Sequence, residues 1–320
     1  FEGFVFPDGD KPNWQTLSAL QKCFMKWFNK EREKALLTFP VVTVAMLTEN
    51  NRVRCREYSQ FCATELSEGN SFFIYLSDTA DSLASCCRLR NEITRTDFSY
   101  SLGAGGVATG SLNVITMNMN RLIQNSRDLS EQVVKIQKYQ VAYRKLMEDF
   151  KANGMLTVYD AGFISMDKQY LTIGINGMVE AAEFLGLEVS DNEEYKRFLQ
   201  QHLKIIYDLN KAAKKHYGYS FNTEFVPAEN LGVKNAKWDQ KDGYYAPREC
   251  YNSYFYIVED NDIDFTDKLN LHGHEVIQYL DGGSALHLNM EEYLTKQQYV
   301  YLLDQAARVG CNYFCTNVKV

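Results

Sequence analysis

Apolar and polar positions along the chain follow two different periods. Apolar residues recur at helical spacing in six segments and predict amphipathic helices: 13–35, 55–70, 130–153 with Ser130 as its cap, 192–218, 265–283 and 295–308. Runs of β-branched, aromatic and apolar residues predict strands: 37–48, 71–77, 111–122, 219–226, 285–290 and 311–318. Residues 168–186 pass from a strand through Gly174 and Gly177 into a helix that closes at Gly186. This alternation predicts an α/β sheet or barrel whose strand ends and loops hold the chemistry.

The length of 320 residues suits one large α/β domain or two smaller ones. We find no internal repeat and no low-complexity linker, so we predict a single domain, 1–320. The chain begins at Phe1 without a methionine and stops in an apolar run, so both ends look cut.

The formal net charge of -7 argues against a nucleic-acid partner, because phosphate backbones require clustered Lys and Arg. Small anionic ligands stay possible, since backbone N–H groups can bind them. No apolar run approaches the roughly 20 residues of a membrane span, and no leader opens the chain. We therefore expect a soluble, cytoplasmic protein without a membrane partner.

Eight cysteines are too sparse and irregular for a disulfide scaffold, so we expect reduced thiols: Cys23, Cys55, Cys62, Cys86, Cys87, Cys250, Cys311 and Cys315. Cys311 and Cys315 form a CxxxC pair that lacks the further ligands of a zinc site. His272 and His274 also lack further metal ligands, so we favour a solvated or packed pair. The sequence therefore predicts no metal site in this chain.

The pair Cys86 and Cys87 precedes a glycine-rich loop, "SLGAGGVATGS". A nucleophilic thiolate requires a nearby base or positive group, but no histidine occurs before His202. A thiol that exchanges hydrogen atoms needs no base and benefits from a dry site. From the residues alone, buried packing cysteines beside a flexible loop remain the simpler interpretation.

Eight stretches in order carry a family resemblance: "LTFPVVTVAML", "SCCRL", "GGVATGSLNVITMNMNRL", "LTIGINGMVEAAEFLG", "FVPAENL", "CYNSYFYIV", "YLDGGSALHL" and "GCNYFCTNVKV". Together they resemble the catalytic domain of the anaerobic (class III, glycyl-radical) ribonucleoside-triphosphate reductases, from about residue 36 to the end. That family folds as a ten-stranded α/β barrel of two antiparallel half-barrels, with an active-site loop threaded through the centre. The resemblance implies that this chain is α/β and forms part of such a barrel.

In that family a cysteine on the central loop holds a transient thiyl radical. The radical removes the 3'-hydrogen of a ribonucleotide and so eases departure of the 2'-hydroxyl as water. The resemblance gives this role to Cys87, the second cysteine of "SCCR", and makes Cys86 its neighbour at the substrate. A radical thiol must stay protonated and shielded, which agrees with the absence of a nearby base.

The resemblance also implies that Gly110 lies at the substrate. It further implies that the polar residue just after Gly110 faces the 2'- and 3'-hydroxyls of the ribose. Formate-using members have asparagine there, whereas the "LxVxT" pattern aligns Ser111 in this chain, which puts formate as the reductant in doubt. Asn113 lies two residues on, so on an extended segment it would point to the same side. Alternatively, Ser111 caps the turn and Asn113 satisfies backbone groups.

The stretch "FVPAENL" places Pro227 at a first helical position, so that free N–H groups point toward an anion. By resemblance, Pro227, Ala228, Glu229 and Asn230 hold the substrate phosphates and ribose. The alternative is that Glu229 only complements the helix dipole. For the "DGGS" stretch at 281–284 we favour a tight turn over a ligand contact.

The family stores its radical on a glycine in a C-terminal loop that follows a four-cysteine zinc site, and neither motif occurs here. We therefore expect a segment, from a split gene or a truncated chain, that needs three partners to act on a ribonucleoside triphosphate. These are a complementary reductase segment with the glycyl radical and zinc, an S-adenosylmethionine-dependent activase, and a second copy in a homodimer, since open barrel edges need covering. The alternatives are a non-catalytic nucleotide-binding or subunit-packing barrel module and a cysteine-dependent hydrolase.

Overall fold

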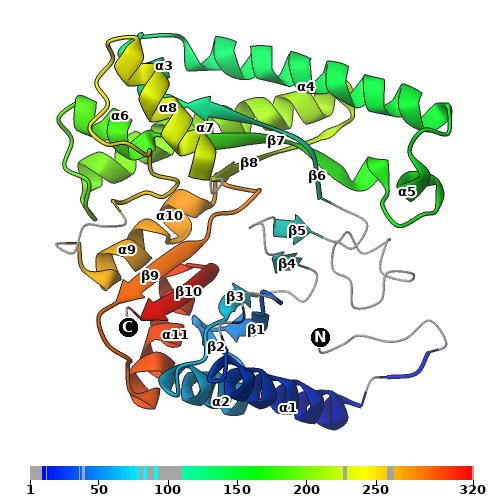
Figure 1. Ribbon diagram of the computed structural model, residues 1–320, viewed down its shortest axis with the longest axis vertical. Coiled ribbons are helices and arrows are strands. Elements are labelled where there is room, and N and C mark those ends of the chain that lie inside the picture. Colours follow the sequence, from blue (N-terminus) through cyan, green and yellow to red (C-terminus); the bar gives the residue numbers. More distant parts are fainter. Residues whose placement is uncertain are drawn as a thin grey trace. The chain divides into compact units, whose positions relative to one another are not determined.

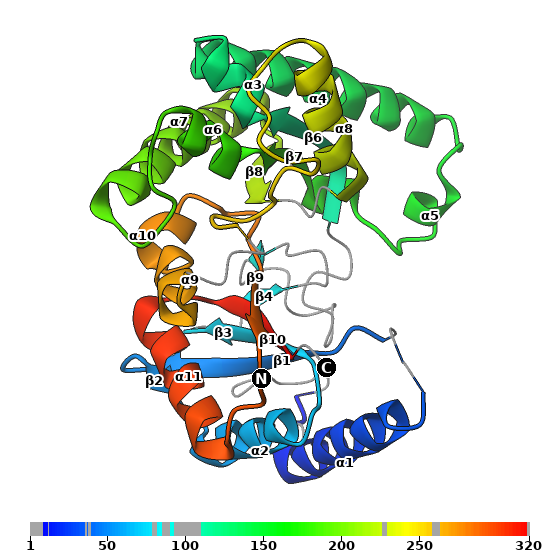
Figure 2. The same cartoon turned by 60° about the vertical axis from the view of Figure 1, so that its left-hand side comes forward.

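The computed structural model of the chain describes residues 9–11, 13–35, 37, 40–78, 82–84, 90–92, 110–225, 229–257 and 263–318. The chain forms two compact units, which Figures 1 and 2 show from two sides. The described residues up to Ala84 join those from Leu286 onward in one unit, and Gly110 to Ala285 belong to the other. Each unit has its own sheet and helices, so the fold is mixed α/β as predicted.

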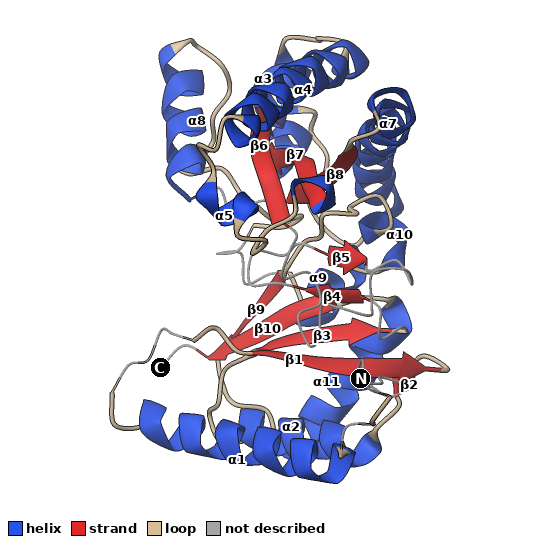
Figure 3. Cartoon of the chain, turned by 90° about the vertical axis from the view of Figure 1, so that its right-hand side faces the viewer, coloured by secondary structure: helices blue, strands red, loops and turns tan. Residues whose placement is uncertain are grey.

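The first unit is built on a five-stranded mixed sheet in the order β2-β1-β3-β10-β9. Its strands are β1 (Thr43–Glu49), β2 (Arg52–Val53), β3 (Phe73–Ser77), β9 (Leu286–Met290) and β10 (Tyr313–Val318). Strands β1 and β3 are parallel, as are β9 and β10, whereas β3 and β10 are antiparallel. Figure 3 shows the helices along one face of this sheet: α1 (Trp14–Arg32), α2 (Arg56–Ser67) and α11 (Lys296–Val309).

Two short strands, β4 (Ser82–Ala84) and β5 (Arg90–Glu92), form a separate two-stranded sheet. The connection between them contains Cys86 and Cys87 and lies outside the described residues.

The second unit is built on three parallel strands in the order β6-β7-β8: β6 (Gly110–Asn118), β7 (Gln169–Asn176) and β8 (Ser220–Phe225). Two long helices, α4 (Leu129–Ala152) and α7 (Glu193–Tyr217), pack against one face of this sheet. Their apolar side chains meet those of the strands in a buried cluster of Val141, Leu171, Ala213 and Phe221. The remaining helices are α3 (Met119–Gln124), α5 (Thr157–Asp160), the 3-10 turn Met166–Lys168, α6 (Met178–Phe184), α8 (Glu229–Lys241), α9 (Phe265–Leu271) and α10 (His274–Ile277).

The helix ends explain where the predicted boundaries hold and where they fail. Helix α11 begins at the predicted Thr295 with a full capping box, and α7 ends at a left-handed Gly218. Helix α4 is capped by Asp128 and not by Ser130, because the Asp128 carboxylate accepts from the backbone N–H of Ser130 at 2.7 Å. The cap prediction at Ser130 was therefore two residues late.

Two predicted segments are divided in the structure. The segment 111–122 is a strand only to Asn118, whose side chain then caps α3 by accepting from the N–H of Arg121 at 3.1 Å. The helical pattern of 265–283 gives two short helices, α9 and α10, separated at Gly273. Across the described parts of the chain, no helix combines the length and apolar character that crossing a membrane requires.

Candidate functional site

The carboxyl ends of β6, β7 and β8 lie at one edge of the sheet of the second unit, because the three strands are parallel. Strand β6 ends at Asn118, β7 at Asn176 and β8 at Phe225, and α3 and α6 begin directly after the first two. In open parallel sheets this edge is where ligands bind. One part of the candidate site therefore lies at this edge.

Helix α8 follows β8 and carries part of the predicted phosphate site. Glu229 is its first residue and Asn230 is exposed, whereas Pro227 and Ala228 lie outside the described residues. With 13 residues, the helix has a full macrodipole whose positive end is at Glu229. The described part of "FVPAENL" thus begins a helix at Glu229, whereas the predicted first helical residue, Pro227, lies outside the described residues.

Three residues at helical spacing fix α8 against the strand ends. At Gly232 a Cβ atom would lie 2.9 Å from the backbone oxygen of Tyr251, so only glycine allows this close approach. Asn235 donates from Nδ2 to Oδ1 of the buried Asn176 at 2.9 Å. One turn further on, Asp239 is fully buried. The direction of the α8 amino terminus is therefore set by contacts along its buried face.

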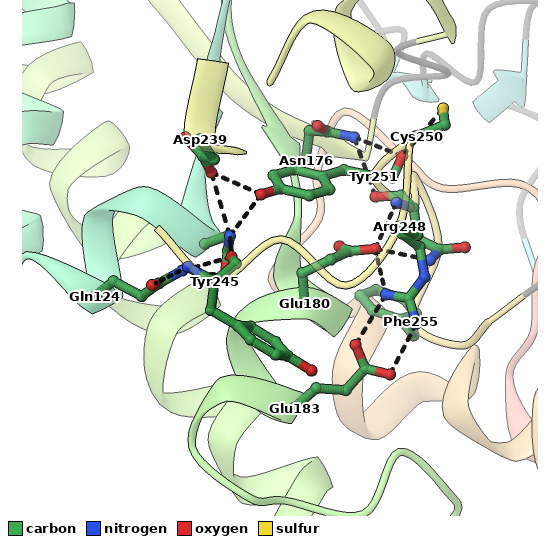
Figure 4. Close-up of polar contacts among 12 residues, drawn as sticks. Gln124, Asn176, Glu180, Glu183, Asp239, Tyr245, Arg248, Cys250, Tyr251 and Phe255 are labelled. Carbon is green, nitrogen blue, oxygen red and sulfur yellow. Dashed lines mark hydrogen bonds and ion pairs between the residues drawn. The ribbon is translucent and has the colours of Figure 1, made fainter. Parts of the chain in front are cut away.

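The carboxylate of Asp239 is surrounded by donors, and we call this group the Asp239 cluster: Asn118, Asn120, Arg121, Asp239 and Tyr251. The Asp239 carboxylate accepts from Nδ2 of Asn118 at 3.0 and 3.1 Å, Nδ2 of Asn120 at 3.2 Å and Nε of Arg121 at 2.6 Å. The Tyr251 hydroxyl donates to it at 2.8 Å, as Figure 4 shows. Burial raises the pKa of Tyr251, so the phenol stays protonated and keeps donating.

A second buried carboxylate holds the loop that carries Tyr251. Figure 4 shows Arg248 between Glu180 and Glu183, with nitrogen–oxygen distances of 2.7 and 2.8 Å. Glu180 is fully buried and also accepts from the backbone N–H of Asn252 at 3.0 Å. Burial raises the pKa of Glu180, against the opposing effect of the Asn252 hydrogen bonds and of Arg248.

A row of three polar side chains crosses the sheet, one from each strand, and we call Ser111, Thr172 and Asn222 the polar row. Ser111 Oγ lies 2.5 Å from Thr172 Oγ1, and Thr172 Oγ1 donates to Asn222 Oδ1 at 2.6 Å. Thr172 and Asn222 are fully buried, whereas Ser111 is half-buried at the end of the row. The Nδ2 atom of Asn222 is buried and has no hydrogen-bond partner among the described residues.

The predicted shared direction of Ser111 and Asn113 is wrong, because the strand is irregular between them. Ser111 is opposite Tyr170 and Asn113 is opposite Leu171, so Leu112 forms a β-bulge. Tyr170 and Leu171 are neighbours on β7 and point to opposite faces of the sheet. Ser111 therefore faces the Thr172 side, and the bulge takes Asn113 out of the alternation that was expected to place it there. Gly110, also predicted at the substrate, is the first residue of β6.

The stretch 281–284 packs against the edge of β8 beside the polar row. The backbone N–H of Thr223 donates to Asp281 Oδ1, and the N–H of Gly282 donates to the Thr223 oxygen, both at 2.8 Å. A Cβ atom on Gly282 would lie 2.7 Å from the Thr223 oxygen and 3.1 Å from Asn222 Nδ2. The predicted tight turn therefore also encloses the side chain of Asn222.

The described cysteines and the paired histidines differ in their surroundings. All six described cysteines are free thiols: Cys23, Cys55, Cys62, Cys250, Cys311 and Cys315. Burial raises the pKa of Cys311 to about 12, so it is an inert packed thiol. His272 is buried against Phe255, and His274 is exposed. Within the described ranges, no three His, Cys, Asp or Glu side chains are grouped to hold a metal ion.

Sequence reasoning did not identify five central residues of this site: Thr172, Glu180, Asn222, Asp239 and Tyr251. A signal was present for Thr172, a polar residue between the apolar Leu171 and Ile173 of β7. Asn222 does not stand out in the same way, because four of the six residues of β8 are polar. Asp239 carried no such signal, because a charged residue in a polar helix is normally exposed.

The chain is similar to proteins of one known family. The family model described as anaerobic ribonucleoside-triphosphate reductase matches residues 11–320. The anaerobic ribonucleotide reductase from Thermotoga maritima in complex with dATP and CTP is 28% identical with a TM-score of 0.86, covering 100% of this chain and 54% of that chain. The same enzyme with glycerol in its active site is also 28% identical, with a TM-score of 0.85. That match covers 100% of this chain and 55% of that chain.

A more distant structure shares the fold alone. A glycyl radical enzyme from Archaeoglobus fulgidus is 10% identical with a TM-score of 0.59, covering 98% of this chain and 50% of that chain. A search of curated proteins finds no significant match. The chain spans about half the length of the solved relatives it matches.

Proposed function

Because the chain belongs to the anaerobic ribonucleoside-triphosphate reductase family, we propose that it is a catalytic segment of an enzyme that reduces ribonucleoside triphosphates to deoxyribonucleotides. The observation that carries this proposal is the family match over residues 11–320, together with the Thermotoga maritima structure at 28% identity. That structure contains dATP and CTP, which supports a nucleotide as the ligand.

Cys87 is the residue to which we assign the chemistry on the sugar. As a thiyl radical, its sulfur takes the 3'-hydrogen of the ribose, and the 2'-hydroxyl then leaves as water. A glycyl radical on a complementary segment supplies the site that accepts the hydrogen atom of the Cys87 thiol. The two electrons of the net reduction come from formate or from a thiol reductant.

The remaining predicted residues bind and orient the substrate. The amino terminus of α8, with Pro227, Ala228, Glu229 and Asn230, receives the phosphates, because its free N–H groups and dipole favour an anion. The contacts at Gly232, Asn235 and Asp239 support this assignment by fixing the direction of that helix. Ser111 contacts the sugar hydroxyls, with Gly110 and Cys86 as its surroundings.

Several wider features of the enzyme belong to the same proposal. Both units form one catalytic domain over residues 1–320 within a ten-stranded barrel, and the protein is cytoplasmic. A radical S-adenosylmethionine activase generates the glycyl radical, zinc occupies a site in the complementary segment, and the enzyme works as a homodimer.

Anaerobic reconstitution tests the proposal directly. The chain would be combined with the complementary segment and the activase, and deoxyribonucleotide formation from a ribonucleoside triphosphate would be measured. We expect Cys87→Ala to abolish product, whereas the control Cys23→Ala, at an exposed thiol of α1, should leave it unchanged. Full activity of Cys87→Ala would refute the assignment of the radical thiol.

Calorimetric titration separates the enzyme from a non-catalytic nucleotide-binding or packing module. A binding module would bind ribonucleoside triphosphates with or without the complementary segment and yield no product. A cysteine-dependent hydrolase would instead require Cys87 to react readily with iodoacetamide at neutral pH.

A further inference from the structure

The polar row has a defined hydrogen-bond direction that starts from Asn222. An amide oxygen can only accept, so the Thr172 hydroxyl donates its single proton to Asn222 Oδ1 over 2.6 Å. The contact of 2.5 Å between Thr172 and Ser111 then needs a proton from Ser111. The Ser111 hydroxyl therefore donates toward Thr172, and only its lone pairs remain for another group.

The buried part of the row is held on several sides. Asn222 and Thr172 have no exposed surface, and Gly282 approaches the Asn222 amide so closely that a Cβ atom would lie 3.1 Å from Nδ2. The backbone oxygen of Thr172 accepts from Nε2 of the buried Gln140 in α4 at 2.7 Å. Burial and Gly282 restrict rotation of the Asn222 amide, and Gln140 holds the backbone of Thr172, so the direction of the row is fixed by the fold.

Ser111 is the accessible end of this row. It is half-buried, and it lies on β6 directly after Gly110 and one residue before the bulge. The bulge turns Asn113 away from this face, so Ser111 is the hydroxyl that remains there next to Thr172. A group approaching this end meets an oxygen that can accept but has already used its proton.

We propose that Thr172 and Asn222 are positioning residues that fix Ser111 as a hydrogen-bond acceptor for a ribose hydroxyl of the substrate. The inference rests on the proposed function, because it takes the ligand at Ser111 to be the sugar of a ribonucleotide. The row thereby favours a ligand with a free hydroxyl at this position. A sugar that lacks the hydroxyl leaves the Ser111 lone pairs without a donor, which weakens its binding.

The test uses matched variants in the reconstituted enzyme. Thr172→Val removes the hydroxyl without changing the shape, Thr172→Ser keeps the hydroxyl, and Asn222→Asp keeps an acceptor whereas Asn222→Leu does not. The control is Thr223→Val, a buried threonine of β8 that accepts from Asn210 at 3.0 Å on the opposite face. Two quantities are measured for each: turnover, and the ratio of Kd values for a ribonucleoside triphosphate and its 2',3'-dideoxy analogue.

We expect Thr172→Val to lower turnover about tenfold and to reduce the preference for the ribose form by a similar factor. Thr172→Ser and Asn222→Asp should retain most of both quantities, and Thr223→Val should change neither. Equal behaviour of Thr172→Val and Thr223→Val would overturn the inference. Equal losses in Asn222→Asp and Asn222→Leu would also overturn it, because the amide would then have to be a donor.

Two outcomes separate this inference from the proposed function. If Cys87→Ala is inactive while Thr172→Val behaves as wild type, only the role of the polar row fails. If Cys87→Ala keeps full activity, the proposed function itself fails. The Kd ratio needs no turnover, so it tests the row in either case.

Discussion

The Asp239 cluster and the polar row lie in the same unit and contain similar side chains, but their hydrogen bonds are completed to different degrees. The Asp239 carboxylate accepts from four surrounding side chains. The polar row ends in Asn222, whose buried Nδ2 has no partner among the described residues, and in the half-buried hydroxyl of Ser111. Around the Asp239 carboxylate the network is closed, with Arg121 Nη2 also 2.7 Å from Asp242, whereas the polar row is open at its ends.

This difference distinguishes a structural network from the one that we propose for ligand binding. A completed buried network stabilises a single arrangement of the strands and helices around it. Buried polar atoms without partners are rare in native proteins, and each is explained by an ordered water, an ion, strain or a functional role. We therefore expect substitutions in the Asp239 cluster to lower stability, and substitutions in the polar row to lower ligand recognition more than stability.

The largest effect is expected at Asp239. Asp239→Ala breaks the ion pair of the buried carboxylate with Arg121 and leaves the buried Tyr251 hydroxyl without its acceptor. It should lower the free energy of unfolding by about 3–5 kcal/mol. Denaturant unfolding measures this loss. Asp242→Ala is the matched control, because Asp242 pairs with the same Arg121 from an exposed position and should cost less than about 1 kcal/mol. Equal losses would remove the distinction between the two carboxylates.

The next effect concerns Gly177, which starts α6 with a φ of 78°. Gly177→Ala combines the left-handed strain of about 1–2 kcal/mol with a contact of 3.1 Å between the new Cβ and the Tyr251 ring. Gly218→Ala has the same strain, with a φ of 76°, but no atom within 4 Å of the new Cβ. Gly177→Ala should therefore lower the melting temperature further, and equal shifts would contradict close packing at the cluster.

A pH-dependent effect is expected from Glu180. Its pKa is raised above the ordinary value of 4.5, so the folded protein binds this proton more tightly than the unfolded chain. The contribution of Glu180 to stability is then present at low pH and falls as the pH rises above 4.5. The slope is at most about 1.4 kcal/mol per pH unit.

Glu180→Gln cannot titrate, so it isolates this contribution. Wild type should lose stability relative to Glu180→Gln as the pH is raised from about 4.5 toward neutrality, which urea unfolding at several pH values would measure. A difference that grows in favour of wild type over the same range would show that pairing with Arg248 outweighs the burial of Glu180.

The smallest change in stability is expected at Ser111. Ser111→Ala removes only the terminal hydrogen bond of the polar row and should cost about 1 kcal/mol or less, because its side chain is only half-buried. Preference for the ribose form of the nucleotide should fall in the same variant. A loss of stability as large as that of Asp239→Ala would place the polar row among the closed structural networks.

The regular elements could be predicted from the sequence because their periods are dictated by local burial. The helices α1, α2, α4, α7 and α11 and the strands β1, β3 and β9 lie within their predicted segments, apart from the first residue of α4 and the last residue of α11. Asp and Ser both cap helices well, so the sequence pattern alone does not distinguish Asp128 from Ser130 as the first capping residue of α4. The bulge at Leu112 arises from the pairing of β6 with β7. The residue pattern within β6 alone does not indicate it.

The family motifs predicted candidate substrate contacts, but not the residues that hold them. Ser111 was found from its motif, whereas Thr172 and Asn222 come from strands 61 and 111 positions away and meet it only in the folded sheet. Asp239 is similar, since its donors lie between 12 and 121 positions away. Such side-chain pairs follow from tertiary contact and not from spacing along the chain.

The central claim is that the sulfur of Cys87 takes the 3'-hydrogen of a bound ribonucleotide, and one isotope measurement tests it most directly. A single turnover of the reconstituted enzyme would be followed with a ribonucleoside triphosphate carrying hydrogen or deuterium at the 3'-carbon. We predict slower deoxyribonucleotide formation from the deuterated substrate and no product in Cys87→Ala. Equal rates from both substrates, with product still formed in Cys87→Ala, would contradict the claim.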